Sequence, residues 1–370
     1  MRRVPVIDIT DLYIPAQDAA DNFDLLLPYA LPEIDLRAVI FDTTEKMRQP
    51  VSQHLGFEDA NGPRDPGFIA VMQLNYIFGR TVPCATSPFS PLRAPDDPMH
   101  DVPAFQQQGI ELILETLRRS ERPVAIMTQG SVRALAAAYN REPELLRAKV
   151  ERIHISAGAV GTQSIATVPD FLEWNVSLDP HAFVRLLCSD LPIALYPCAT
   201  EEGPFGYGQH TSFWQMTDMR FIAQMHPRLR RYLGYAFGRL SRIDFLRAMD
   251  ADLPEELMEQ IYTLSDPAHP DGRHYVWETA LWTNITDRLL VRRQAGEYRM
   301  VPRNELLPTD VVLPNKLRPC HLDVHDDGRF ASTLTSEPTS SMLYDRGDPF
   351  ENERAFRQAL TTLYTSFAPE

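Results

Sequence analysis

Short apolar segments of strand length alternate with segments of helical periodicity through the first half of this chain. The apolar segments are brief and flanked by turn-forming residues, which is typical of strands that are buried on both faces. Alternation of this kind favours an α/β fold with a mostly parallel, doubly wound central sheet and helices on both of its faces. The predicted strands are Val4–Asp8, Leu36–Phe41, Pro123–Met127, Arg152–Ser156 and Pro192–Tyr196.

Helix signals lie between and after these strands. The segment Asp21–Leu31 has apolar residues at helical spacing, and Pro28 is expected to kink or shorten that helix. Asp179 followed by Pro180 predicts a helix start, because Asp caps the first turn and Pro suits the first helical position. A last helix is predicted near residue 360, with an apolar face made of Phe356, Leu360, Leu363, Tyr364 and Phe367.

Two regions interrupt the alternation. Residues 42–105 are rich in Pro, Asp and Asn, and we expect an irregular insertion there within a single domain that spans residues 1–370. Residues 200–215 combine glycines with aromatic residues after a predicted strand. Such a loop can serve as a lid over a substrate ring, and an irregular packed surface loop is an equally good interpretation.

Composition excludes several classes of function. The chain has 370 residues and a formal net charge of −14, which argues against nucleic acid or an anionic membrane as the main partner. Its four cysteines are far apart and form no Cys-x-x-Cys pair, so reduced thiols are expected rather than a zinc site or a disulfide framework. The first apolar run is too short for a signal peptide or a membrane span, and we expect a cytoplasmic protein.

Polar residues stand near the carboxyl ends of the predicted strands. In parallel α/β sheets, ligands collect outside these ends, where the connecting loops lie. Asp8, Thr128, Ser156 and Tyr196 all occupy such positions, which favours one shared site. Acidic residues are concentrated after the first strand, at Asp8, Asp11, Asp18 and Asp21.

Carboxylates in that arrangement have two interpretations. Calcium binds six to eight hard oxygen ligands, and a strand end, an acidic loop and a helix start can supply several of them. Asp at a helix start is also favourable without a metal, through capping and the helix dipole, and acids in a loop are commonly solvated. Spacing alone leaves both interpretations open.

Three segments resemble the inosine–uridine preferring nucleoside hydrolase family. Leu31-Pro32-Glu33-Ile34-Asp35-Leu36 is similar to a segment after the family's first helix, and Met127–Ala136 is similar to its Gly-Pro-Leu-Thr-Asn-Ile-Ala turn. Glu173-Trp174-Asn175, with Asp179-Pro180 after it, resembles the family's Glu-Phe-Asn and Asp-Pro. The resemblance implies a nucleoside hydrolase-like fold, a small-molecule nucleoside substrate, a bound calcium ion, a role in purine or pyrimidine salvage and a homo-oligomer, either dimer or tetramer.

The resemblance also assigns roles to particular residues. The calcium ligands it implies are Asp8, Asp21, the carbonyl of Val132 and Glu278. The catalytic acids it implies are Asp11 and Asp8. Its substrate contacts fall on Glu173 and Asn175, for ribose hydroxyls. Apart from the resemblance, Trp277 can stack on the base, and His210 in the Gly-aromatic loop is a candidate near the leaving group.

Several positions depart from the family pattern. The loop from Asp8 to Asp21 is six residues longer than the family's motif and lacks its Pro-Gly, and Ala20 stands where the family has Asp. The family's water-activating acid falls on Thr10 or Asp11, and Asp11 is our choice. The amide after the third strand falls near Asp42 or Glu45, and the late His-Asp pair falls on Trp277 and Glu278.

The resemblance therefore implies hydrolysis of an N-glycosidic bond, in which a calcium-bound water attacks an oxocarbenium-like ribosyl centre. Asp11 or Asp8 would take the proton of that water. No residue is clearly assigned to activate the leaving group, and His210 and His274 are the candidates. Two alternatives stay open: a diverged, weak or inactive protein that binds a nucleoside or another ribosyl ligand, and an unrelated glycoside or metal-dependent hydrolase on a similar sheet.

Overall fold

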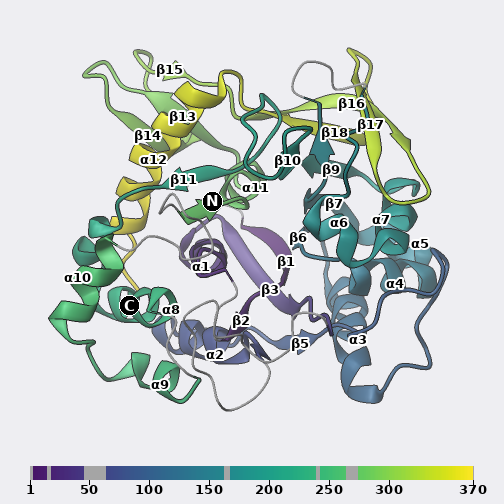
Figure 1. Ribbon diagram of the computed structural model, residues 1–370, viewed down its shortest axis with the longest axis horizontal. Coiled ribbons are helices and arrows are strands. Elements are labelled where there is room, and N and C mark those ends of the chain that lie inside the picture. The colour runs from purple at the N-terminus through teal and green to yellow at the C-terminus, as the bar shows by residue number, and fades with distance from the viewer. Residues whose placement is uncertain are drawn as a thin grey trace.

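A computed structural model describes residues 3–14, 18–45, 64–161, 167–238, 242–263 and 274–369. Its main element is a nine-stranded sheet with the order β17-β16-β18-β9-β7-β6-β1-β3-β5 (Figure 1). The strands from β18 to β5 in this order run parallel, and β16 is antiparallel to both of its neighbours. The bounds are β1 Val4–Thr10, β3 Ile34–Phe41, β5 Cys84–Thr86, β6 Val124–Gln129, β7 Val150–Ser156, β9 Ile193–Tyr196, β16 Lys316–Val324, β17 Phe330–Leu334 and β18 Ser341–Asp345.

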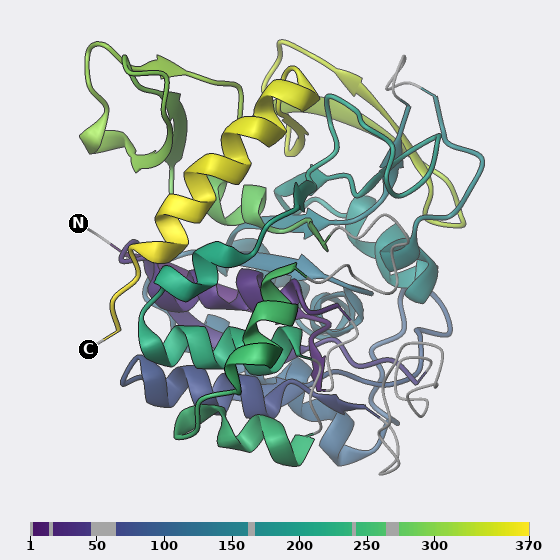
Figure 2. The same cartoon turned by 60° about the vertical axis from the view of Figure 1, so that its left-hand side comes forward.

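Helices cover both faces of this sheet (Figures 1 and 2). Successive side chains of a strand point to opposite faces, so in β1 Val6 packs into one apolar core and Ile7 into the other. The core around Val6 includes helices α1 Asp21–Ala30, α2 Phe68–Ile77, α8 Pro227–Phe237, α11 Thr279–Ile285 and α12 Pro349–Thr365. The core around Ile7 includes α3 Ala104–Arg119, α4 Arg133–Arg141, α5 Pro143–Lys149 and α7 Pro180–Leu187.

Smaller elements surround the central sheet. Short strand pairs and one three-stranded sheet are formed by β2 Tyr13–Ile14 with β4 Asp65–Pro66, β8 Ala159–Val160 with β10 Ala199–Thr200, β11 Trp214–Met216 with β12 His274–Val276, and β13 Arg288–Arg292 with β14 Tyr298–Pro302 and β15 Val311–Val312. The shorter helices are α6 Trp174–Leu178, η3 Arg220–Gln224, α9 Arg242–Leu246, η4 Arg247–Met249, α10 Glu255–Thr263 and η5 Arg303–Glu305. No helix in the described part of the chain is long and apolar enough to cross a membrane.

The prediction of a mostly parallel, doubly wound α/β fold is confirmed. Pro28 lies inside α1, two residues before the end of that helix, so it shortens the helix less than expected. Part of the segment 42–105 is regular: α2 is helical, and β5 pairs with β3 at the edge of the sheet. Residues 46–63 of that segment lie outside the described residues. Helix α2 is apolar almost all round, which removes the periodicity that reveals a surface helix.

A buried ion pair joins helix α4 to the start of helix α7. The Arg133 Nε atom donates to Asp179 Oδ2 at 2.9 Å, and their side chains are 1% and 0% exposed. The remaining guanidinium N–H groups donate to backbone carbonyls, including those of Pro88 at 2.7 Å and Leu178 at 3.1 Å. Asp179 also accepts the amide of Ala182 as the cap of α7. Arg133 therefore links α4, α7 and the loop before α3 through these bonds.

We expect Arg133→Met to destabilise the fold by about 3–5 kcal/mol, because it leaves the Asp179 charge buried without its partner. Arg119→Met is the matched control, because that side chain is 79% exposed and its pairing with Glu115 is worth less than about 1 kcal/mol. Urea unfolding of the two variants measures the difference. Equal losses of unfolding free energy would show that the buried pair contributes no more to stability than the exposed pair does.

Candidate functional site

A cavity of about 470 Å³ lies at the carboxyl edge of the parallel strands. Residues that end or directly follow β1, β6 and β9 contribute to it through Asp11, Gln129 and Cys198, because parallel strands present their carboxyl ends at one edge of a sheet. Loops and helix starts complete the lining. The other lining residues are Asp18, Asp21, Glu173, Trp174, Asn175, Pro204, Phe205, Trp277 and Glu278.

Six of the predicted site residues meet in this cavity. Its lining includes Asp11, Asp21, Glu173, Asn175, Trp277 and Glu278, which come from segments as far apart in sequence as the first loop and the start of α11. Asp8, Thr128, Ser156 and Tyr196, which were expected to share a site because they lie near strand ends, are not among the lining residues. The functional role of each residue stays a prediction.

Buried carboxylates crowd the floor of the cavity. Burial raises the pKa of Asp11 well above its usual range, and repulsion from Asp42 and Glu278 raises it further. Burial likewise raises the pKa of Asp21, with added repulsion from Asp18 and Asp11. Each group is disfavoured as a free anion because water is excluded and like charges are close.

Glu278 is held by neighbours from two strand ends. The Ser156 hydroxyl donates to Glu278 Oε1 at 3.1 Å. When the Gln129 side-chain amide is oriented to satisfy both of its neighbours, its nitrogen donates to the same oxygen at 2.8 Å and its oxygen accepts the Thr10 hydroxyl at 2.7 Å. These bonds orient the carboxylate of Glu278 from the ends of β1, β6 and β7.

Asp24 is a site residue that the sequence analysis missed. Its fully buried carboxyl accepts the Thr279 hydroxyl at 3.1 Å. Burial and repulsion from Glu278 raise the pKa of Asp24 well above its usual range, and burial also raises the pKa of Glu278. The available signal was helical spacing, because Asp21 and Asp24 are three residues apart and share one face of α1.

Asp8 lies beside the cavity but not on its surface. Its side chain is 0% exposed, and neither carboxylate oxygen has a hydrogen-bond partner among the described residues. Burial raises the pKa of Asp8, and repulsion from Glu278 adds to the shift. An orphaned buried carboxylate is costly unless a proton or a cation compensates it.

Glu173 has a structural task in addition to its predicted one. It is the N-cap of α6, and its carboxylate accepts the amides of Asn175 at 3.1 Å and Val176 at 3.3 Å. A further bond from the Gly158 amide at 2.9 Å joins it to the end of β7. The Asn175 side-chain amide in turn donates to the Ser156 carbonyl at 2.9 Å. These bonds fix both residues at the cavity wall.

Aromatic side chains form another part of the lining. The Trp277 Nε1 atom donates to the Cys198 carbonyl at 3.1 Å, which fixes the orientation of the indole. The ring of Phe205 lies 6.1 Å from that of Trp277, centroid to centroid, and tilts by 47°. Phe205 comes from the Gly-aromatic loop, so part of this loop contributes to the site as the lid interpretation expects.

Three other residues named from the sequence are not brought to the cavity surface. Val132 is the left-handed N-cap of α4, with φ of 51°, and its carbonyl accepts the Ala136 amide at 3.0 Å. His210 is buried, and its Nδ1 contacts the Tyr344 carbonyl at 2.7 Å. His274 in β12 packs edge-on against Phe237 and does not line the cavity either. The family-derived roles of these residues therefore gain no support from their positions.

Asp42 has a clear task below the cavity. It accepts the Ser131 hydroxyl at 2.7 Å and the Ser131 amide at 2.5 Å. These bonds join the end of β3 to the turn between β6 and α4. The carboxylate thus takes donors from the protein itself, whereas an amide at this position would present its own donor to them.

The residues suit a hard divalent cation in chemistry but do not form a closed ligand set. The cavity offers several carboxylate oxygens, and the orphaned oxygens of Asp8 lie close to Glu278. A cation would offset the repulsion that raises the pKa values of Asp11 and Asp21. Among the described residues, no three acidic, histidine or cysteine side chains are already grouped to hold a metal ion. The donor types therefore fit calcium, and coordination would require side chains to move closer together.

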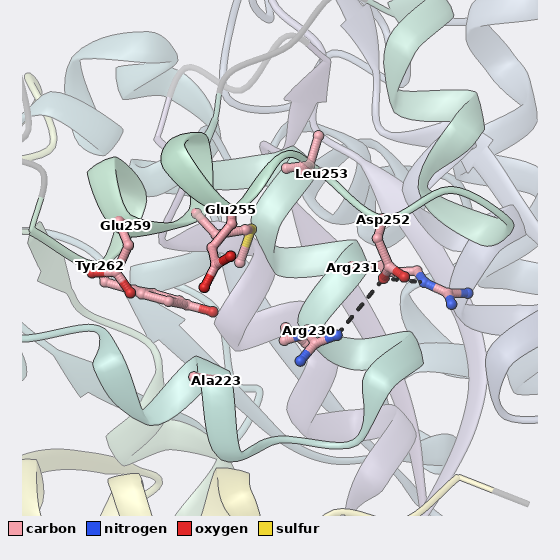
Figure 3. Close-up of a pocket in the computed structure, with 9 residues that line it drawn as sticks. Ala223, Arg230, Arg231, Asp252, Leu253, Glu255, Glu259 and Tyr262 are labelled. Atoms are coloured by element: carbon pink, nitrogen blue, oxygen red, sulfur yellow. Dashed lines mark hydrogen bonds and ion pairs between the residues drawn. The ribbon is translucent and has the colours of Figure 1, made fainter.

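A second cavity of about 330 Å³ lies between α8 and α10 (Figure 3). Arg231 and Arg230 project toward Asp252, at 2.7 Å and 3.7 Å, and Glu255 and Glu259 project from α10. Its two arginines are thus already paired within the protein. It also lacks buried carboxyl groups with strongly raised pKa values, such as those of the first cavity. We therefore take the first cavity as the functional site.

The family of the chain is shown by comparison with known proteins. The family model described as inosine-uridine preferring nucleoside hydrolase matches residues 56–264, which is more than half of the chain. The chain belongs to this family. The match leaves out the acidic segment after β1 and also Glu278, so the assignments there rest on motif resemblance and on geometry.

Sequence relatives agree with this assignment. Over 183 residues the chain is 29% identical to the pyrimidine-specific ribonucleoside hydrolase RihA of Escherichia coli O127:H6, an alignment that covers 47% of this chain and 55% of the relative. RihA of Salmonella agona is 34% identical over 103 residues, 27% of this chain and 32% of the relative. The chain thus spans about half the length of the first of these relatives and about a third of the length of the second.

Solved structures support the fold. The purine-preferring ribonucleoside hydrolase of Gardnerella vaginalis matches with a TM-score of 0.52 and 12% identity, over 98% of this chain and 99% of the other. A plant nucleoside hydrolase matches with a TM-score of 0.50 and 15% identity, over 97% and 99% of the two chains. At these identities the likeness shows the shared α/β fold.

We expect Gly158→Ala to be more destabilising than Gly296→Ala. Both glycines have a positive φ, 89° and 84°, so each substitution costs roughly 1–2 kcal/mol of backbone strain. An added Cβ at Gly158 would meet a Phe330 ring atom at 2.4 Å, whereas nothing lies within 4 Å at Gly296. Overpacking should add about 1–3 kcal/mol at Gly158 alone. Denaturant unfolding measures both losses, and equal values would contradict this account of the Gly158–Glu173 junction.

Proposed function

We propose that this protein hydrolyses the N-glycosidic bond of a ribonucleoside or a similar ribosyl compound. The observation that carries the proposal is the convergence of Asp11, Asp21, Glu278 and Asn175 on one cavity at the carboxyl edge of the sheet. Family membership and the names of the relatives, which are ribonucleoside hydrolases, support the same reaction. The cavity volume of about 470 Å³ suits a small molecule.

Asp11 is our choice for the group that takes the proton of the attacking water. It lines the cavity, and its environment keeps its pKa above the usual range of a carboxyl. A base with a raised pKa is better matched to proton transfer near neutral pH than an ordinary aspartate. Glu173 and Asn175, both fixed at the wall, would orient the ribose hydroxyls, as the resemblance implies.

Calcium would be held by oxygens of Asp8, Asp21 and Glu278, and the Val132 carbonyl stays a weaker prediction. When bound, calcium would orient water and ribose hydroxyls and stabilise developing charge. The protein's own contribution is to keep Glu278 fixed through Ser156 and Gln129. Trp277 would pack against the leaving group.

A binding protein with weak or no turnover is the second candidate. The carboxylate of Glu173 is already engaged by backbone amides, and the described lining contains no histidine to protonate a leaving group. Such a protein would still hold a ribosyl ligand in the cavity. It would release no ribose.

We also propose cytoplasmic function in nucleoside salvage, and assembly as a homo-oligomer. The support is the family resemblance and the four cysteines, which are free thiols. Size-exclusion chromatography with light scattering tests the assembly. A strict monomer would end that part of the proposal.

Ribose release from uridine and inosine tests the proposed reaction. We expect Asp11→Asn to lower kcat/KM by about 10²–10⁴-fold, because the amide cannot accept the proton. Glu144→Gln is the control, since that side chain is 85% exposed on α5 and lies outside the cavity. Turnover by the parent protein with no loss in Asp11→Asn would remove Asp11 from the mechanism, and binding without ribose release would favour the second candidate.

Calcium should raise the melting temperature more at pH 8 than at pH 5. The pKa values of Asp11 and Asp21 are raised in the folded state, so their contribution to stability is present at low pH and is lost as pH rises through those values. A cation replaces the protons and restores that stability, in competition with them. Thermal unfolding with calcium or with a chelator measures the shift. An identical melting temperature in both, at both pH values, would count against a calcium site.

A further inference from the structure

A third cavity, of about 410 Å³, lies at the opposite edge of the sheet from the first. Its lining comes from Arg3 before β1, from residues 34–37 at the start of β3 and from the turn 79–83 that precedes β5. Because β1, β3 and β5 run parallel, this cavity lies where they begin and the first cavity lies where β1 ends. A ligand bound here would not touch the residues of the proposed reaction.

Positive charge collects in this cavity although the chain as a whole carries a formal charge of −14. Its lining holds three arginines, Arg3, Arg37 and Arg80, and one acid, Asp35, which is a surplus of two positive charges. Asp35 forms an ion pair with Arg37. Among the residues that the structure describes, no carboxylate forms an ion pair with Arg3 or Arg80. These two guanidinium groups are therefore left to a ligand or to solvent.

The Arg80 side chain is partly buried and is held in position by the protein itself. Its Nη1 atom donates to the Pro28 carbonyl at 3.3 Å, and its guanidinium carbon lies 5.9 Å from the centre of the Tyr29 ring. Burial lowers the pKa of Arg80 from its ordinary value, and repulsion from Arg3 lowers it further. Like charges that are close together and partly withdrawn from water are unfavourable until an anion joins them. An arginine that is only solvated has neither feature, so this pair favours an anionic ligand.

The charge and the donors of the cavity match a phosphomonoester. Such a group carries about −1.5 to −2 charges near neutral pH, close to the surplus in the lining, whereas one carboxylate supplies only one charge. Guanidinium groups present forked pairs of N–H donors that fit phosphate oxygens, and Thr81 adds a hydroxyl and a backbone amide to the lining. The volume of about 410 Å³ also leaves room for an organic group attached to the phosphate.

We propose that this arginine cavity binds the phosphate of a small phosphomonoester, either a sugar phosphate or a nucleoside monophosphate. Arg3 and Arg80 supply the charge that is not already neutralised, and Arg37 shares its charge with Asp35. The sugar or nucleoside occupies the rest of the cavity. The inference goes beyond the proposed hydrolysis and does not depend on it, because no described residue lines both cavities.

Calorimetry on the full chain tests this site. The probes are ribose 5-phosphate, uridine monophosphate, inorganic phosphate and succinate, and a chelator keeps metal ions from drawing phosphate to the first cavity. We expect Arg3→Gln and Arg80→Gln each to weaken binding of the two esters about tenfold, because each removes charged hydrogen-bond donors. Arg119→Gln removes the same charge from a side chain that is 79% exposed on α3 and is the matched control. The ester that binds more tightly identifies a sugar phosphate or a nucleotide as the preferred ligand.

Weaker binding in both cavity variants but not in Arg119→Gln supports the inference. Arg3→Gln changes an exposed side chain, so it keeps the test decisive if Arg80→Gln lowers stability. Unchanged affinity in the cavity variants overturns the site, as does an absence of binding at millimolar concentration. Inorganic phosphate or succinate binding as tightly as the esters overturns the phosphomonoester as the ligand. None of these readouts involves ribose release, so the proposed reaction and this inference can fail separately.

Discussion

The parallel pairing of β1 between β6 and β3 is the constraint on which the site depends. Because these strands run in one direction, the residues that end or follow them meet at one edge, and Asp11, Gln129 and Asp42 are brought within one small region. Gly130 shows how tight this edge is, since a Cβ there would meet Asp42 Oδ2 at 2.5 Å. The packing leaves little freedom for the residues that follow β1 and β3 at this edge.

Charge is the unusual feature of this edge. Burial of so many carboxyl groups is unfavourable unless protons, cations or donors compensate them. The protein supplies one of these solutions to Glu278, which accepts donors from Ser156 and Gln129. Asp8 has no such donor among the described residues. The electrostatic imbalance that remains is the physical basis for expecting a bound cation.

Structural and functional tasks overlap at the cavity wall. Glu173 caps α6 and receives Gly158 from the end of β7, which holds Asn175 and Trp174 beside the cavity. A helix of five residues has little stability of its own, so the cap and the contact with β7 carry much of its placement. The motif that most resembles the family therefore also has a structural role, because it attaches α6 to the end of β7. A role in sugar binding would be in addition to this structural role.

The sequence by itself determined the alternation of strands and helices and the parallel sheet, because periodicity and strand polarity are local properties with fixed geometric consequences. Motif resemblance to the family selected Asp11, Asp21, Glu173, Asn175, Trp277 and Glu278, and only the tertiary structure shows that they line one cavity. The sequence did not reveal Asp24, whose importance depends on α11 packing against α1 and placing Glu278 beside it. Nor could it place Val132 and His210 off the cavity, since the direction of a carbonyl or an imidazole depends on contacts such as those with Ala136 and Tyr344. Hydrogen-bond partners distant in sequence decide these orientations, and only the tertiary structure supplies them.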